Sequence, residues 1–219
     1  MPNPIWESFW SDTVNHEWWK RPAQEVLQFI DMQSVAQRPK VLDLGCGLGR
    51  HAIAFALAGF QVTATDVAST AIKHLDRWAA EVGVCVKTKI CDILDDETSQ
   101  PEYDIVLSYN VIYHGYREDF ARAISYVHSL LKCGGVFFFT CPTRRDGKYG
   151  HGEQVAPHTF LCTKSMTPGD IHYFADEQDF EQLLEGFRTV SRHIYEGYWD
   201  NNGTQQRYSN WTVITEKTE

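Results

Sequence analysis

KVLDLGCGLGR, residues 40–50, is the stretch that decides the fold of this chain. A short apolar run surrounds the acidic residue Asp43, and glycines follow at alternate positions, Gly45, Gly47 and Gly49. Residues 51–58 are mostly apolar and are typical of a helix. A strand, a glycine turn and a helix in this order predict a nucleotide-binding βα unit, because glycines let the backbone approach a ligand and adopt positive φ.

The spacing of the glycines indicates which ligand this turn binds. Dinucleotide-binding turns have the pattern G-x-G-x-x-G, in which a pyrophosphate meets the helix N-terminus. Here the third glycine comes one place earlier, and the carboxylate of Asp43 would repel a pyrophosphate. A cationic ligand suits the turn better, and S-adenosylmethionine (SAM) carries a sulfonium and an ammonium group. A nicotinamide-dependent dehydrogenase is the less favoured alternative.

Four further segments follow in an order that resembles the class I SAM-dependent methyltransferases. They are Gln61 to Asp66, Cys91-Asp92-Ile93, Tyr103 to Ser108, and Leu130 to Phe139. Within that superfamily the C-terminal pattern is most similar to small-molecule methyltransferases of the tellurite-resistance type, on residues 173–180, 185–187 and 200–217. The resemblance implies methyl transfer from SAM, with S-adenosylhomocysteine as the product.

The alternation of predicted elements indicates an α/β fold. Strands are expected at 40–44, 61–65, 84–90, 103–108, 135–141, 189–198 and 206–216, and helices at 49–59, 69–82, 117–131 and 176–185. Helices between strands favour a mostly parallel sheet with helices on both faces, and the turn signal at 200–203 predicts that the last hairpin is antiparallel. The resemblance implies a Rossmann-like seven-stranded sheet in the order 3-2-1-4-5-7-6.

The length of 219 residues predicts a single domain, residues 1–219. Residues 1–37 are expected to form an aromatic-rich N-terminal helical cap, whose rings either pack over the sheet or line the substrate entrance. Residues 142–174 are interrupted by glycine and proline, so we expect a long, substrate-facing loop inserted after the fifth strand.

Cofactor-binding residues are expected at the carboxyl ends of the first strands. Asp66 is expected to accept hydrogen bonds from the ribose diol, the alternative being a helix cap. The resemblance assigns Asp92 to the adenine amine and the Ile93 backbone to the adenine ring. Asp43 is expected to orient the loop or, through water, the ammonium of the ligand. The remaining predicted cofactor-binding residues are Gly45, Gly47, Gly49, Val67 and Asn110.

Tyr113 and His114 are the candidate catalytic residues, because they follow the fourth strand at the same sheet edge. Histidine titrates near neutral pH, so His114 is a candidate to take a proton from the acceptor, with packing as the alternative. The transfer itself needs little acid–base help, since the sulfonium is a good leaving group. The expected acceptor is a thiol, metalloid, amine or oxygen of a small molecule. A SAM-binding regulatory module without transferase activity is the alternative function.

The composition limits the partners of the chain. The formal net charge is −9 and no basic stripe is present, which argues against nucleic acid. No apolar run approaches the roughly 20 residues that span a bilayer, and no export signal is recognised, so we expect no membrane partner and a cytoplasmic protein. No metal site is expected, because His151, Glu153, His158, Cys162 and His172 match no compact ligand motif. No oligomeric state is predicted.

Overall fold

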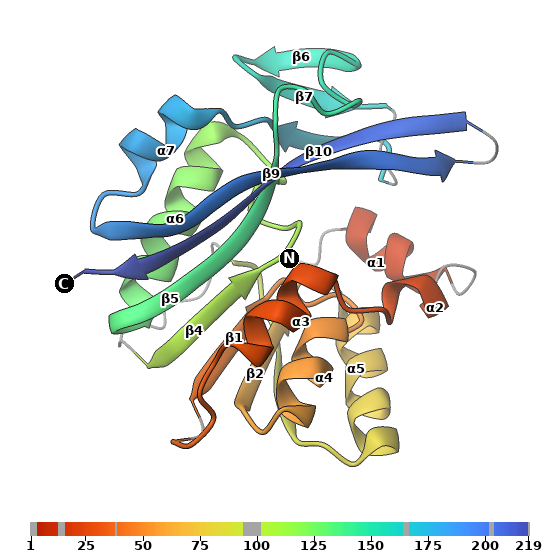
Figure 1. Ribbon diagram of the computed structural model, residues 1–219. Coiled ribbons are helices and arrows are strands. Elements are labelled where there is room, and N and C mark those ends of the chain that lie inside the picture. The colour runs from red at the N-terminus through yellow and green to blue at the C-terminus, as the bar shows by residue number, and fades with distance from the viewer. Residues whose placement is uncertain are drawn as a thin grey trace. The chain divides into compact units, whose positions relative to one another are not determined.

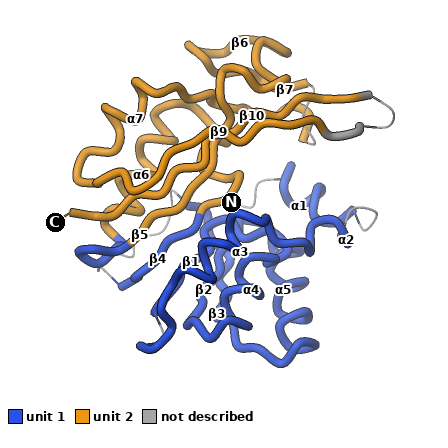
Figure 2. Tube along the Cα trace, viewed as in Figure 1, with its two compact units in different colours: residues 1–107, 130–135 blue, residues 108–129, 136–219 orange. Residues whose placement is uncertain are grey.

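The computed structural model describes residues 4–12, 16–37, 39–93, 102–163, 167–201 and 204–218 (Figure 1). The chain divides into two compact units (Figure 2). Unit 1 comprises residues 1–107 and 130–135, and unit 2 comprises residues 108–129 and 136–219. Within the described residues, no helix combines the length and the apolar character needed to cross a membrane.

Unit 1 is built from βα repeats. Its strands are β1 (Lys40–Leu44), β2 (Gln61–Asp66), β3 (Val86–Ile90) and β4 (Tyr103–Ser108), and β1 pairs in parallel with both β2 and β4, while β2 pairs with β3. Helix α4 (Arg50–Leu57) joins β1 to β2, and α5 (Ser69–Val82) joins β2 to β3. Three helices precede the sheet: α1 (Pro4–Ser11), α2 (His16–Trp19) and α3 (Gln24–Asp31).

Apolar periodicity explains why these segments form these elements. Helix α5 buries Ala71, Ile72, Leu75 and Ala79, which recur at helical spacing along one face. The helix ends at Gly83, whose φ of +74° is the left-handed conformation that glycine adopts without a Cβ penalty. The burial of this apolar stripe explains why residues 69–82 form a helix.

Unit 2 contains most of β5 (Leu131–Pro142), together with α6 (Arg117–Leu130), α7 (Glu177–Leu183), β9 (Phe187–Asn201) and β10 (Thr204–Lys217). Strand β10 pairs antiparallel with both β5 and β9. Buried rings of Phe120, Phe137, Phe139 and Phe180 form its core.

The seven-stranded sheet has the order β3-β2-β1-β4-β5-β10-β9. Strands β9 and β10 are the sixth and seventh strands predicted from the sequence, so this order agrees with the predicted 3-2-1-4-5-7-6 once the three strands of a second sheet are left out of the count. The predicted α/β class, with a mostly parallel sheet and an antiparallel final hairpin, is confirmed.

The prediction that residues 142–174 form a long loop is wrong. They contain β6 (Gly152–Ala156), β7 (Thr159–Cys162) and β8 (Asp170–Tyr173), which pair antiparallel in the order β6-β7-β8. The reason is a small apolar cluster of Phe160, Cys162 and Phe174, against which Tyr149 packs. The glycines and prolines that suggested a loop lie mainly at the turns and ends of these short strands.

Candidate functional site

The glycine turn of unit 1 adopts left-handed backbone conformations. Gly45, Gly47 and Gly49 have φ values of +74°, +54° and +88°. The backbone N–H groups of Gly45 and Cys46 both donate to the carbonyl of Thr65 at 2.8 Å, which joins the turn to β2. A Cβ atom on Gly47 would lie 2.6 Å from the Trp10 ring, so this position requires glycine for space as well as for φ.

Asp66 ties the glycine turn to the end of β2. Its carboxylate is buried; Oδ2 accepts from the N–H of Gly47 at 2.8 Å, and Oδ1 accepts from the N–H of Ala68 at 2.9 Å. Burial raises the pKa of Asp66, and these backbone donors oppose that shift. Each carboxylate oxygen has two acceptor positions, so Asp66 retains the capacity to accept from ligand hydroxyls. The turn and its carboxylate therefore fit a ribose-bearing ligand.

Asp43, near the end of β1, is buried and orients the following helix. Its Oδ2 accepts from the N–H of Ala52 in the first turn of α4 at 3.0 Å. Burial raises the pKa of Asp43 to about 7, although the Ala52 donor and the charge of Arg50 act in the opposite direction. This contact holds the first turn of α4, and the predicted role of Asp43 in orienting the loop or the ligand stays a prediction.

The aromatic cap packs on the glycine turn. Trp10 forms a buried cluster with Leu48, Ala68 and Ala71, against which the rings of Trp6, Phe9 and Trp19 pack. These rings form edge-to-face pairs, and the centroids of Trp10 and Trp19 lie 5.5 Å apart. The cap thus covers part of the backbone that the sequence assigns to the cofactor.

Three further predicted residues follow β2 and β3. Val67 lies between Asp66 and Ala68, while Asp92 and Ile93 follow Cys91 after the end of β3, and all three are partly buried. The N–H of Cys91 donates to the carbonyl of Asp66 at 3.1 Å, so the ends of the two strands are joined. Eight of the nine predicted cofactor-binding residues therefore lie in unit 1, near the carboxyl ends of its first three strands.

Asn110, the ninth, lies in unit 2 after β4. Its φ of +60° is rare for a residue other than glycine, although asparagine tolerates it better than most. Thr140 on β5 holds this conformation: its hydroxyl accepts from the Asn110 N–H at 2.8 Å and donates to Asn110 Oδ1 at 2.9 Å. Non-glycine residues in this region are enriched at functional loops.

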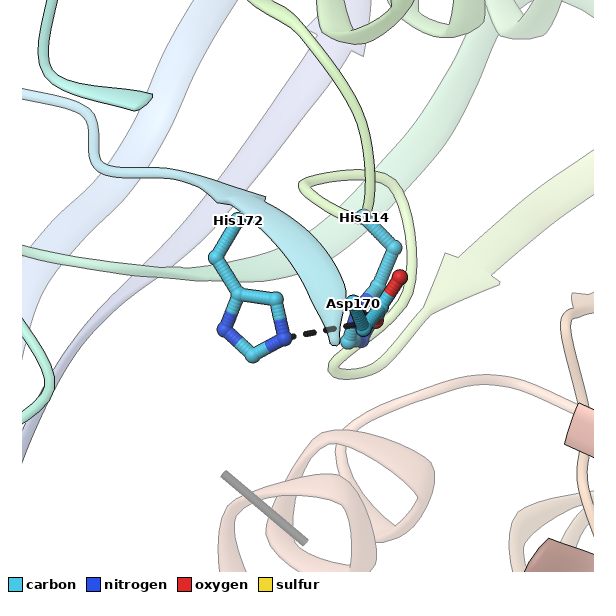
Figure 3. A group of neighbouring side chains, drawn as sticks. All are labelled: His114, Asp170 and His172. Atoms are coloured by element: carbon cyan, nitrogen blue, oxygen red, sulfur yellow. Dashed lines mark hydrogen bonds and ion pairs between the residues drawn. The ribbon is translucent and has the colours of Figure 1, made fainter. Parts of the chain in front are cut away.

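His114, Asp170 and His172 form a largely buried cluster in unit 2 (Figure 3). His114 Nδ1 lies 2.5 Å from Asp170 Oδ2, and His114 Nε2 lies 3.2 Å from the carbonyl oxygen of Asn110. His172 Nε2 lies 3.3 Å from the same Asp170 oxygen. The side chains are 13%, 10% and 3% exposed for His114, Asp170 and His172 respectively. The structure therefore places Asp170 between two imidazoles.

Burial and neighbouring charge shift the pKa values of Asp170 and His172. Although burial raises it, the pKa of Asp170 is held well below its usual range by the hydrogen bond with His114 and by His172. Burial lowers the pKa of His172 to about 4, so this imidazole is neutral at pH 7. Asp170 carboxylate and the Asn110 carbonyl are both acceptors, so His114 donates through both ring nitrogens in this arrangement.

The hydroxyl of Tyr113 stays protonated. Burial, chiefly, and the nearby carboxylates of Asp146 and Asp170 raise the pKa of Tyr113 well above its usual value. The Tyr113 ring packs against His114 and, edge-on, against His172. This residue therefore shapes the cluster rather than accepting a proton at neutral pH.

Sequence reasoning missed Asp170 and the capping residue Glu7. Asp170 and His172 alternate along β8, and an Asp-x-His pair on one face of a strand was the available signal. Glu7 on α1 accepts from the backbone N–H groups and the hydroxyls of Ser69 and Thr70, and so caps α5. No local pattern links Glu7 to a helix that starts 62 residues later.

Comparisons with known proteins show what the sequence and the fold of this chain resemble. A family model described as a methyltransferase domain matches residues 41–135. A ubiquinone biosynthesis O-methyltransferase of Chromobacterium violaceum is 32% identical over 145 residues, which cover 61% of this chain and 61% of that relative. The match thus spans less than two thirds of the relative's length.

Solved structures share the fold. A SAM-dependent methyltransferase from Methanosarcina mazei superposes with a TM-score of 0.72 at 18% identity, covering 90% of this chain and 99% of that chain. TehB from Haemophilus influenzae superposes with a TM-score of 0.69 at 18% identity, covering 90% of this chain and 63% of that chain.

Residues 41–135 therefore match a methyltransferase domain, and the chain shares the fold of solved SAM-dependent methyltransferases. The predicted resemblance to this superfamily is confirmed, and the TehB superposition supports the narrower likeness to the tellurite-resistance type at the level of the fold.

Proposed function

We propose that this chain transfers a methyl group from SAM to a small molecule, with a hydroxyl oxygen as the favoured acceptor. The observation that carries the proposal is the hydrogen bond from the Gly47 N–H to the buried Asp66 carboxylate. This bond fixes a turn in which a Cβ atom on Gly47 would not fit. The choice of oxygen rests on relatives named O-methyltransferases, of which the first is 32% identical. Thiol, metalloid and amine acceptors are the alternatives.

The proposal gives each unit its own task. In unit 1, Asp66 binds the ribose hydroxyls, Asp92 and Ile93 bind the adenine, and the glycine turn provides backbone contact. When bound, SAM supplies a methyl group from a sulfonium that leaves as a neutral thioether, and the proton of the hydroxyl acceptor leaves to the solvent. In unit 2, Asn110 belongs to the cofactor side, and Tyr113 and His114 belong to the acceptor side. Their task is to orient the acceptor, because orientation supplies much of the acceleration in such a displacement.

The test is transfer of tritium-labelled methyl from SAM to a panel of phenols, catechols, thiols, amines and tellurite. We expect label in a hydroxyl compound and an equal amount of S-adenosylhomocysteine. Transfer of label only to a thiol, an amine or tellurite would show that this group, and not a hydroxyl oxygen, is the acceptor. Binding of S-adenosylhomocysteine without transfer to any acceptor would favour the regulatory module over the enzyme.

Asp66→Asn provides the matched variant for this assay. The amide keeps the size of the side chain, but it has one acceptor oxygen where the charged carboxylate has two. We therefore expect the rate of methyl transfer at low SAM concentration to fall. Asp76→Asn, an exposed aspartate on α5, is the control and retains the rate. We propose, in addition, that the protein acts in the cytoplasm on a small molecule, and that its partners are neither nucleic acid nor a membrane.

A further inference from the structure

We propose that His114, Asp170 and His172 bind a divalent transition-metal ion. The proposal does not rest on SAM binding, because none of these three unit 2 residues is assigned a contact with SAM. It departs from the expectation that no metal site is present, which was based on sequence spacing alone.

The donor atoms are already close enough to share an ion. One atom from each side chain can be chosen so that all three lie within 4.8 Å of one another. Ligands at about 2.0–2.2 Å from one ion lie roughly 3–4 Å from each other. Only small side-chain movements therefore separate the observed cluster from a coordinated one.

The backbone holds the three residues in place. Asp170 and His172 are two residues apart on β8, so their side chains lie on the same face of the strand. An isolated antiparallel bridge joins His114 to His172. The Gly115 N–H donates to the Ile171 carbonyl, and the Tyr173 N–H donates to the Tyr113 carbonyl, each at 2.9 Å. Two segments far apart in sequence are thus fixed with their side chains converging (Figure 3).

His114 has the hydrogen-bond pattern of a metal ligand. A ligating histidine usually donates its second ring N–H to a carbonyl or carboxylate, which fixes the tautomer. His114 Nε2 donates to the Asn110 carbonyl at 3.2 Å, so Nδ1 is directed at Asp170. Binding of the ion at Nδ1 displaces one proton, which leaves to the solvent, and the Asp170 carboxylate then ligates the ion.

His172 is the observation that a simple hydrogen-bonded pair does not explain. It is 3% exposed, and within the described part of the chain neither ring nitrogen forms a hydrogen bond. Its Nε2 nevertheless faces Asp170 Oδ2 at 3.3 Å. A buried polar atom without a partner is costly, and a metal ion between Nε2 and the carboxylate would satisfy it.

The ligand set indicates the class of ion. Two imidazoles and one carboxylate suit zinc, iron, cobalt and nickel, whereas magnesium and calcium prefer sites made of oxygen ligands. Three protein ligands leave at least one coordination position open for water or another oxygen ligand, unlike a closed structural zinc site.

The experiment is a titration of the chelator-treated full chain with Co²⁺ alone, followed by visible absorption and calorimetry. We expect one equivalent of Co²⁺ per chain, with the ligand-field bands of a nitrogen and oxygen site and without the charge-transfer band of a thiolate ligand. The last criterion matters because the chain has six cysteines.

Asp170→Asn and His172→Gln each remove one ligand and are expected to weaken Co²⁺ binding by roughly tenfold or more. The matched control is His128→Gln, which removes a partly buried imidazole on α6 that contacts Phe187. This control retains the affinity of the wild type. Far-ultraviolet circular dichroism checks that every variant is folded.

Three results would overturn the proposal: no saturable Co²⁺ binding by the wild type, an affinity in both ligand variants equal to that of the wild type, or a thiolate charge-transfer band. If the ligand variants do not fold, X-ray absorption of the cobalt-loaded wild type decides. Scattering from two imidazoles supports the site, and its absence contradicts it.

Discussion

Asp43 and Asp66 are buried carboxylates that backbone N–H groups hold in place. Each accepts from the turn or helix that follows β1, through Ala52 and Gly47 respectively. The two side chains therefore fix the glycine turn from both sides before any ligand arrives, so that little reordering is needed on binding.

The raised pKa of Asp43 predicts a pH dependence of stability. Since this pKa is about 7 in the folded state and 3.8 ordinarily, the folded chain binds more protons than the unfolded chain between these values. The free energy of unfolding therefore falls as pH rises across this window. At about 1.4 kcal/mol per pKa unit, the loss is at most about 4 kcal/mol.

Asp43→Asn cannot ionise and so escapes this loss. We expect its free energy of unfolding, relative to the wild type, to rise between about pH 4 and about pH 7. Urea unfolding at both ends of the window measures this, with Asp76→Asn as the exposed control. A difference that does not change with pH would contradict the prediction.

Gly47→Ala tests the close approach of the turn to Trp10. The methyl group would meet the ring at 2.6 Å, in addition to the cost of positive φ. Gly83→Ala is the matched control, because Gly83 has a φ of +74° but nothing lies within 4 Å of its added Cβ. We expect Gly47→Ala to lower the free energy of unfolding by about 1–3 kcal/mol more than the control. If urea unfolding shows equal losses of unfolding free energy in the two variants, the Trp10 ring moves to accommodate the added methyl group.

Local residue patterns could be predicted, and long-range clusters could not. Gly45, Gly47 and Asp66 were found because their spacing repeats a known turn. The pair of His114 and Asp170 was missed because 56 residues separate them, and only the folded backbone brings β8 to His114. Single-sequence spacing carries no information about such a contact.

Helices α1 and α5 show how one element stabilises the start of another. The first backbone N–H groups of a helix have no acceptor within the helix itself. In α5 the N-cap residue Ala68 offers no side-chain acceptor for them. Glu7 of α1 supplies the carboxylate instead, and a negative charge at a helix N-terminus is also favourable. The aromatic cap is therefore anchored by a polar contact as well as by its rings.

Glu7→Gln is expected to lower the free energy of unfolding by about 0.5–2 kcal/mol at neutral pH, as loss of a helix cap does. The hydrogen bond from Thr70 in particular lowers the pKa of Glu7 from 4.5, so the stabilisation is present above this value and is lost as pH falls through the lower folded value.

Thermal unfolding at neutral and acidic pH measures the effect of this cap. The difference between the wild type and Glu7→Gln should shrink in acid, while Glu81→Gln, which changes an exposed glutamate on α5, should match the wild type at both pH values. A difference that persists in acid would mean that packing of α1, rather than the charge of Glu7, stabilises α5.

Strands and helices with strong periodicity were predicted almost to the residue. Helix α5 has the expected bounds Ser69–Val82, and β1 and β4 also agree. Strand β5 begins at Leu131 rather than at residue 135, so it includes Gly134. The strands of residues 142–174 were missed because short strands between glycine and proline have too little alternation to be recognised.

At the scale of the whole molecule, the alternation of strands and helices predicted the α/β class, and the family resemblance implied the order of the strands. Neither predicted the division into two compact units, because it depends on which contacts form and not on composition. The cofactor residues of unit 1 and the cluster of unit 2 can each be tested without reference to the other.

The most direct test of the central claim is a calorimetric titration of the full chain with S-adenosylhomocysteine. We predict one site per chain in the wild type and in Asp76→Asn, and a loss of about 1–3 kcal/mol of binding free energy, or roughly 5- to 150-fold in affinity, in Asp66→Asn. Absence of binding by the folded wild type, or an Asp66→Asn affinity equal to that of the wild type, would contradict the assignment of the glycine turn and Asp66 to the methyl donor.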